Sequence, residues 1–326
     1  MKKMKKVLAM LLVVVMGLSL AACGSQEEDV TMRVSGLNGP TTMGMVKLID
    51  DSNNQKANND YTFTIAGTAD EITPLLVKGE LDIAAVPCNL ASVLYNNTEG
   101  QIQILAVNTL GVLYLVEKGD SVNSIADLAG KTIYMTGKGN TPEYTVRYIL
   151  EENGLTVDED VTIEWKNEAN EIVALMQSTD EDIVAVLPQP FATVAQTQVE
   201  GLRTIMDLND AWDALGVESQ IITGVIVARK DFVEQYPEHI NSFLEEYAAS
   251  IDYVNNNTAE AAQLVEGVGI VKAAVAEKAL PNCNIVYLGG EEMKAAVSGY
   301  LQVLYEQNPK AIGGNLPGDD FYYVGK

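Results

Sequence analysis

Histidine, arginine and cysteine are scarce in this sequence, and their scarcity excludes several kinds of chemistry. The 326 residues include one histidine, four arginines and three cysteines. The only histidine, His239, lies in an acidic helical stretch, which excludes a histidine-rich metal site and histidine general-base catalysis. Cys88 and Cys283 are far apart and lack the spacing of a metal site, so they are two free thiols or one disulfide. We therefore expect no metal and no cofactor.

Positive charge is also scarce. Twenty-one lysines and arginines face 45 aspartates and glutamates, which gives a net charge of −24. A chain this acidic is repelled by nucleic acids and by anionic membrane surfaces. The composition therefore argues against nucleic-acid partners, and any attachment to a membrane would need a covalent lipid.

The N-terminal residues have the pattern of a targeting segment. Four lysines precede an apolar stretch from Val7 to Leu18, which is shorter than the roughly 20 residues that span a membrane. This pattern predicts a signal peptide over residues 1–22. Residues 20–23, Leu-Ala-Ala-Cys, resemble the lipobox of bacterial lipoproteins, which implies cleavage before Cys23 and a lipid on its sulfur. Residues 23–30 are expected to form a tether.

The remaining 304 residues show the same order of elements twice. Residues 71–86 and 171–186 share seven of sixteen amino acids without a gap. In both copies a strand leads through a glycine loop into a helix, and a later strand ends at a proline. We expect two similar α/β lobes with largely parallel sheets, joined by a hinge of two crossings. Lobe 1 would comprise residues 31–112 and 222–326, and lobe 2 residues 113–221.

The clearest of these units runs from Lys131 to Leu150. Thr132 to Met135 is a predicted strand, and glycines punctuate the loop that follows. Thr141 is the predicted N-cap of the next helix, with Pro142 at its first position. Such a helix start presents N–H groups that can hold a small polar or anionic ligand, although an ordinary strand-to-helix turn has the same pattern.

Ligands of α/β sheets bind beyond the carboxyl ends of the strands. Four loops of this chain are expected at those ends: Gly36–Thr42, Pro87–Asn89, Thr136–Thr141 and Pro188–Pro190. If the lobes face one another, all four loops line one cleft. No arginine lies in these loops, so an anion would be held by helix N-termini, hydroxyls and one lysine. Aromatic residues are scarce there; the nearest are Tyr95, Tyr144 and Phe191. The candidate ligand contacts, each of which could instead be a turn former, are Asn38, Thr41, Thr42, Asn89, Lys138, Asn140, Thr141 and Gln189, with Thr223 near the hinge.

The chain resembles the solute-binding proteins of bacterial ABC importers. It is most similar to the branch that includes nitrate, sulfonate, taurine and thiamine-precursor binders. The resemblance is carried, in this order, by Lys78 to Ala84, Ser124 to Lys131, and Gly224 to Phe232 followed by Pro237-Glu238. It implies the periplasmic-binding-protein type II fold. It also implies an extracytoplasmic, lipid-anchored monomer that captures a small polar or anionic solute and delivers it to a permease with its ATPase.

Two other functions fit the same residues. A lipoprotein that senses a ligand or serves as a scaffold, without transport, would have the same sequence features. Relatives of this fold also include a fungal thiamine-pyrimidine synthase that depends on histidine and a cysteine cluster, and this chain lacks both. An enzyme using Cys88 as nucleophile remains an alternative, because a helix start could lower its pKa. No base for it is evident, so we expect a binding protein without catalytic residues.

Overall fold

The computed structural model of the protein describes residues 30–325. The predicted signal peptide (residues 1–22) and the lipidation site Cys23 lie outside the described residues. Residues 32–326 cluster as one compact unit. Within the described part of the chain, no helix is both long and apolar enough to span a membrane.

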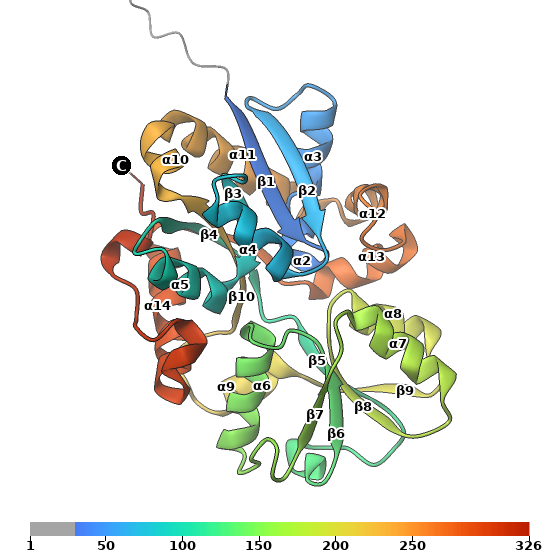
Figure 1. The fold of residues 1–326 in the computed structure, drawn as a ribbon. Coiled ribbons are helices and arrows are strands. Elements are labelled where there is room, and N and C mark those ends of the chain that lie inside the picture. Colours follow the sequence, from blue (N-terminus) through green and yellow to red (C-terminus); the bar gives the residue numbers. More distant parts are fainter. Residues whose placement is uncertain (1–29, 326) are drawn as a thin grey trace, which may run out of the picture. The chain divides into compact units, whose positions relative to one another are not determined.

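The strands form two sheets (Figure 1). The six-stranded sheet has the order β11-β4-β10-β3-β1-β2, and the five-stranded sheet has the order β7-β6-β8-β5-β9. The strands of the first are β1 (Thr31–Leu37), β2 (Asp60–Ala66), β3 (Ile83–Pro87), β4 (Ile102–Leu110), β10 (Ile222–Arg229) and β11 (Ile285–Gly289). Those of the second are β5 (Leu113–Lys118), β6 (Thr132–Met135), β7 (Thr162–Trp165), β8 (Ile183–Pro188) and β9 (Leu202–Asp207).

The two sheets repeat one arrangement, which confirms the expectation of two similar α/β lobes. The order β2-β1-β3-β10-β4 in the first sheet corresponds to β7-β6-β8-β5-β9 in the second. The second sheet is largely parallel, as expected, because β6, β7, β8 and β9 share one direction. In each sheet the strand that comes from the other lobe is an exception: β5 and β10 run antiparallel to both of their neighbours. Each of these strands arrives directly from the other sheet. No crossover helix within its own lobe therefore imposes a parallel direction.

The sequence repeat falls on equivalent elements of the two lobes. Residues 71–86 cover most of α4 (Ala69–Val77) and β3, and residues 171–186 cover most of α7 (Ala169–Ser178) and β8. Glu71 and Glu171 both occupy the third position of their helix. Each accepts a hydrogen bond from the backbone N–H at the helix start, at 2.9 and 3.1 Å respectively. The shared glutamate is therefore a helix-capping feature of both lobes.

The chain passes between the sheets at two places that lie side by side, since Ile222 at the start of β10 is paired with Leu110 at the end of β4. The first lies between Leu110 and Leu113, and the second follows α9 (Leu208–Ala214) and leads into β10. A Cβ on Gly111 would lie 1.8 Å from Asn209 Oδ1, so a larger residue there would displace the Asn209 side chain. The Asn209 amide donates to the Gly111 carbonyl at 3.0 Å. This arrangement agrees with the two-crossing hinge, while the residue boundaries given for the lobes stay a prediction.

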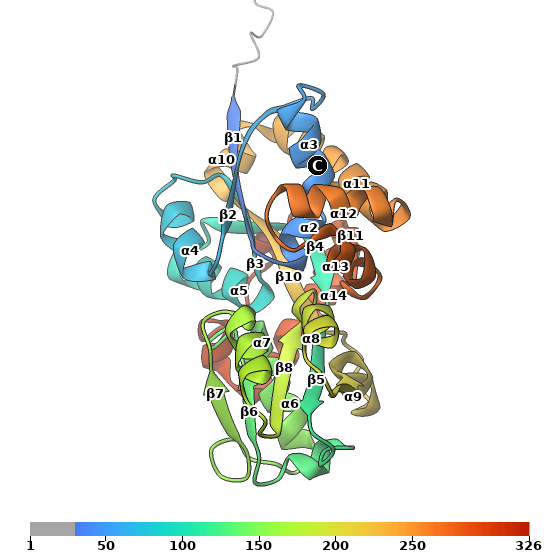
Figure 2. The ribbon, with the colours of Figure 1, turned by 90° about the vertical axis from the view of Figure 1, so that its right-hand side faces the viewer.

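Helices cover the sheets on both sides. Figure 2 shows α4 and α5 on one side of the first sheet and α3, α11 and α12 on the other. The helices not yet named are α2 (Pro40–Met43), α3 (Val46–Asn53), α5 (Cys88–Asn97), α6 (Thr141–Glu152), α8 (Phe191–Gln198), α10 (Lys230–Gln235), α11 (Pro237–Asn256), α12 (Thr258–Gly267), α13 (Ala273–Ala279) and α14 (Gly290–Gln307). Short 3₁₀ turns are η1 (Ile125–Leu128), η2 (Leu280–Asn282), η3 (Pro309–Ile312) and η4 (Asp319–Phe321).

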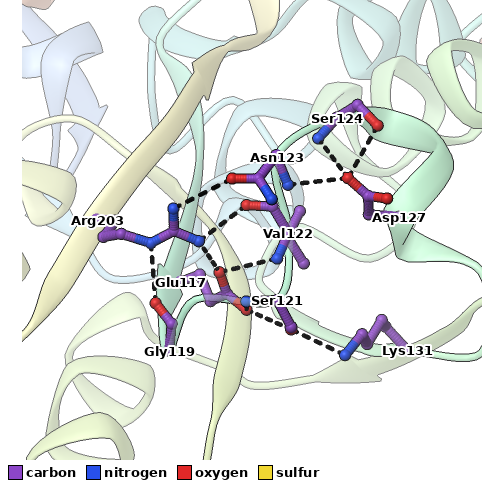
Figure 3. Close-up of polar contacts among 9 residues, drawn as sticks. All are labelled: Glu117, Gly119, Ser121, Val122, Asn123, Ser124, Asp127, Lys131 and Arg203. Atoms are coloured by element: carbon purple, nitrogen blue, oxygen red, sulfur yellow. Dashed lines mark hydrogen bonds and ion pairs between the residues drawn. The ribbon is translucent and has the colours of Figure 1, made fainter.

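A buried carboxylate joins β5 to β9 in the second sheet (Figure 3). The Glu117 side chain is completely buried, and Arg203 on β9 pairs with it at 2.5 Å. The Ser121 hydroxyl and the backbone N–H groups of Ser121 and Val122 also donate to it. Lys131 donates to the Ser121 hydroxyl at 2.9 Å and extends the network toward β6. The carboxylate thus fixes the loop after β5 as well as the sheet edge.

Candidate ligand-binding site

A cavity of about 490 Å³ lies where loops of both sheets meet. Small-molecule sites typically measure about 300–1,000 Å³, so the cavity suits a small organic solute. Its walls come from the carboxyl ends of strands and the helix starts that follow them, as expected for this class of fold. The lining residues are Leu37 to Thr41, Gly67 to Asp70, Pro87, Val112, Thr136 to Lys138, Asn140, Pro142, Trp165 to Asn167, Pro188 and Thr223.

The structure brings five of the nine candidate residues to this cavity. They are Asn38, Thr41, Lys138, Asn140 and Thr223. The other four, Thr42, Asn89, Thr141 and Gln189, are buried and are not among the lining residues. The role of all nine in ligand binding stays a prediction.

Two hydroxyl groups in the cavity wall have no hydrogen-bond partner in the protein. They are Thr41 Oγ1 and Thr223 Oγ1, and both atoms are buried. A Cβ on Gly224, the residue after Thr223, would lie 2.5 Å from Thr41 Cγ2. Glycine at this position therefore lets Thr41 pack closely against the backbone of β10. A buried polar group without a partner costs about 1–3 kcal/mol, so the pair marks a place where a bound molecule could supply the missing partners.

One lysine in the cavity wall, Lys138, has a side chain available to a ligand. Lys138 is exposed and forms no ion pair within residues 30–325. Lys166 also lines the cavity, but it pairs with Glu164 at 2.7 Å and lies 5.5 Å from the centre of the Tyr134 ring. Asp70 contributes an exposed carboxylate to the same wall. Lys138 is therefore the side chain best placed to receive an anionic group.

The helix start beside Lys138 differs from its prediction by one residue. Asn140 is the N-cap of α6, and Thr141 is already helical. Neither side chain caps the helix: the Asn140 amide donates to the Lys138 carbonyl at 3.3 Å, and the Thr141 hydroxyl donates to Asn89 Oδ1 at 3.2 Å. Thr141 is not available as a cap because its hydroxyl is bonded to another helix.

The candidates outside the lining have their polar atoms bonded within the protein. Thr42 donates its hydroxyl to the Leu37 carbonyl at 2.5 Å. Gln189 Oε1 accepts from the Thr193 hydroxyl at 2.9 Å. Asn89 is completely buried and bonds to three other residues, as described below. These contacts shape the loops behind the cavity wall.

The sequence analysis missed two parts of the wall. Trp165, the last residue of β7, supplies a half-buried indole, whereas Tyr95, Tyr144 and Phe191 do not line the cavity. Gly67 to Asp70 line it where β2 leads into α4. Both segments follow strands at the same edge of their sheets, and Gly67 with the Thr68–Glu71 capping box is itself a strand-to-helix signal.

The chain was then compared with known proteins. The NMT1/THI5-like family matches residues 99–261, half of the chain. The chain belongs to this family.

Solved structures share the fold of this NMT1/THI5-like protein. An ABC transporter from Parabacteroides distasonis is 28% identical, with a TM-score of 0.74 over 90% of this chain and 99% of that one. The alkanesulfonate-binding protein SsuA from Xanthomonas axonopodis pv. citri, bound to MOPS, is 14% identical with a TM-score of 0.68, over 90% and 96% of the two chains. The periplasmic aliphatic sulphonate binding protein SsuA from Escherichia coli is 15% identical with a TM-score of 0.70, over 91% and 92%. The periplasmic-binding-protein type II fold is thereby confirmed. No curated protein matches the chain.

Neither described cysteine of this NMT1/THI5-like protein has the surroundings of a nucleophile. Cys88 and Cys283 are free thiols, and both are buried. Burial raises the pKa of Cys283 to about 12 and raises the pKa of Cys88 as well. The helix start at Cys88 therefore does not produce a thiolate near neutral pH. Among the described residues, no group of three or more histidine, cysteine, aspartate and glutamate side chains could hold a metal ion.

Proposed function

We propose that this protein is the extracytoplasmic, substrate-binding component of an ABC importer and captures a small polar or anionic organic solute between its lobes. The observation that carries the proposal is the cavity of about 490 Å³ with unpartnered Thr41 and Thr223 hydroxyls and an uncommitted lysine in its wall. The similarity to the Parabacteroides distasonis ABC transporter supports the transport role. Anchoring through a lipid on Cys23 is part of the proposal and rests on the lipobox-like residues 20–23.

The distribution of contacts suggests how capture would be signalled. Thr41 (in α2) and Thr223 (in β10) lie in the lobe of the first sheet. Lys138 (in the loop after β6) and Trp165 (in β7) lie in the lobe of the second. A ligand that bonds to both groups binds the closed arrangement of the lobes more tightly than an open one. Its differential affinity shifts the equilibrium toward closure, which a permease can read.

The proposal is tested with the soluble chain, residues 24–326, in a thermal-shift screen. The compounds are alkanesulfonates including MOPS, nitrate, pyrimidines, flavins and amino acids. A ligand at 100 times its dissociation constant should stabilise the protein by about 2.7 kcal/mol. Calorimetric titration then gives the affinity of each compound that produces a shift.

Two variants test whether a ligand binds in the cavity. Thr41→Val removes one hydroxyl at nearly constant volume and should weaken binding about fivefold, the worth of one neutral hydrogen bond. Lys138→Ala should weaken an anionic ligand further, because hydrogen bonds to charged groups are worth more, about 1.5–3 kcal/mol. Lys131→Ala is the matched control, since Lys131 bonds to Ser121 and does not line the cavity. Unchanged affinity in both cavity variants would locate the ligand elsewhere and refute this site.

A further inference from the structure

The loop that carries Lys138 is held by a residue of the other sheet's lobe. Asn89 lies in the first turn of α5 and is completely buried. Its side-chain amide donates to the Gly139 carbonyl at 3.2 Å, and its Oδ1 accepts from the Thr141 hydroxyl at 3.2 Å. The two partners are the residues before and after Asn140, so Asn89 binds the chain on both sides of the N-cap of α6.

The Gly139 peptide is held from both directions. Its N–H donates to Glu143 Oε2 at 2.7 Å, and Arg147 binds the other oxygen of that carboxylate at 2.8 Å. Its carbonyl accepts from Asn89. Gly139 has a φ of 75°, a conformation that glycine adopts readily, and because glycine is conformationally free, the hydrogen bonds to its backbone restrict the loop. Without the Asn89 side chain, the hydrogen bonds that remain to this loop come from residues 137–143, within the loop and its own helix.

A third hydrogen bond, outside this loop, fixes the orientation of the Asn89 side chain. Its amide also donates to the Ala311 carbonyl in η3 at 3.0 Å. Ser92, three residues further along α5, donates to the neighbouring Ile312 carbonyl at 2.8 Å and makes no contact with the Lys138 loop. Both residues thus attach α5 to the C-terminal segment, but only Asn89 extends the attachment to the second lobe.

The lobes have further buried contacts near this loop. Tyr300 of α14 shares a hydrogen bond of 2.8 Å with Thr145 of α6, and both are completely buried. The Tyr300 ring also packs against the buried Trp212 of α9, with centroids 5.7 Å apart. Separating the lobes here would expose two large aromatic side chains to water.

A second contact between the lobes is more exposed to solvent. There α13 packs against α8 beside a groove of about 300 Å³, whose lining includes Val194, Val271 and Val275. Val271 and Val275 are already partly exposed. Parting the lobes at this contact therefore transfers less apolar surface to water than parting them at Tyr300. The contacts near Asn89 should stay joined when the cleft opens.

We propose that Asn89 is a positioning residue, which holds the Lys138 loop in its binding conformation from the other lobe even when no ligand is bound. The assignment of this loop to ligand capture rests on the proposed function. The positioning itself does not, because it concerns the order of the loop in the ligand-free protein.

Hydrogen–deuterium exchange of the ligand-free chain, residues 24–326, measures that order directly. The amides of Gly139 and Asn140 report on the loop, since each donates within it, to Glu143 and to the Gly137 carbonyl at 3.0 Å. Asn89→Ala should accelerate their exchange about tenfold, the equivalent of one or two lost hydrogen bonds. Ser92→Ala, which loses its bond to the C-terminal segment only, should leave them at the wild-type rate.

Variants of Thr141 approach the same contact from the other side. Thr141→Val removes the bond to Asn89 Oδ1 but leaves the bond from Asn89 to the Gly139 carbonyl, so it should accelerate the exchange by a smaller factor than Asn89→Ala. Thr141→Ser, which keeps the hydroxyl, should retain the wild-type rate. This pair also covers the case in which Asn89→Ala does not fold. Equal exchange of the loop in Asn89→Ala and Ser92→Ala would overturn the proposal, and so would a wild-type loop that exchanges as fast as an unstructured peptide. Because no ligand is used, failure of the ligand screen leaves this result unchanged.

Discussion

Replacing Glu117 with glutamine should destabilise the protein strongly although the two side chains have the same shape. Ser121 N–H and its hydroxyl donate to one carboxylate oxygen at 3.0 and 2.6 Å. Val122 N–H and Arg203 donate to the other at 3.1 and 2.5 Å. A glutamine amide nitrogen toward Val122 and Arg203 would face two donors, and toward Ser121 it would face the backbone N–H, while the Ser121 hydroxyl could turn to accept from it. At least one hydrogen bond is therefore lost in either orientation, together with the ion pair to Arg203.

The size of the effect follows from burial. Breaking a buried ion pair costs about 3–5 kcal/mol, because the remaining charge stays desolvated. The Glu117 side chain is completely buried, but 37% of the Arg203 side chain is exposed, so water recovers part of the loss at the guanidinium. We therefore expect the free energy of unfolding to fall by about 3 kcal/mol in Glu117→Gln.

Urea unfolding of residues 24–326, followed by tryptophan fluorescence, measures this difference. Glu181→Gln is the matched control, since Glu181 is an exposed carboxylate of the same lobe, and a change there should stay within about 0.5 kcal/mol. The reasoning would be refuted if both variants unfolded at the same urea concentration.

The same carboxylate gives the difference a pH dependence. Burial by itself would raise the pKa of Glu117. The hydrogen bonds from Ser121, Val122 and Arg203 outweigh it and hold the pKa below the ordinary value of 4.5. A carboxyl with a lowered folded-state pKa stabilises the protein fully above its unfolded value and loses this contribution as pH falls through the folded value. The gap between wild type and Glu117→Gln should therefore be constant near neutral pH and close progressively below the unfolded value.

Two further outcomes are expected. Neither Cys88 nor Cys283 should react with a thiol reagent in the native chain of residues 24–326, because both are buried free thiols with raised pKa values. Both should react after unfolding. Rapid labelling of the native protein would contradict this burial. Tyr300→Phe should lower the free energy of unfolding by about 1 kcal/mol through loss of the hydrogen bond to Thr145. Tyr305→Phe is the control variant. Equal stability of the two variants would show that the Thr145 bond contributes nothing.

The location of the cavity could be predicted from the sequence because it depends on local signals. Strand ends and glycine loops mark one edge of each sheet, and the repeat at residues 71–86 and 171–186 identifies the two sheets as equivalent. That reasoning brought Asn38, Lys138 and Thr223 to one cavity. The direction of β5 and β10 was not predictable in the same way, because it depends on where the chain re-enters each lobe and not on the composition of either strand.

Which loop residues face the cavity could not be read from the sequence, because the answer depends on partners in the other lobe. Asn89 and Thr141 are both polar residues at helix starts, the pattern of a ligand contact, yet they bond to each other. Trp165 is a residue type common in strands, so the sequence does not single it out. Its place at the carboxyl end of β7 brings the indole to the cavity wall. Contacts between segments 52 residues apart leave no local pattern.

Thr41 and Thr42 show how the structure separates two roles that the sequence cannot distinguish. The two threonines are adjacent and belong to the same short helix. Thr42 donates to the Leu37 carbonyl and lies so close to Gly36 that a Cβ there would be 2.3 Å from its hydroxyl. Thr41 Oγ1 has no partner within the protein and belongs to the cavity wall. A satisfied hydroxyl contributes to folding and gains nothing from a ligand, whereas an unsatisfied one gains most when a ligand arrives. The same Thr→Val change should therefore reduce stability at Thr42 and affinity at Thr41.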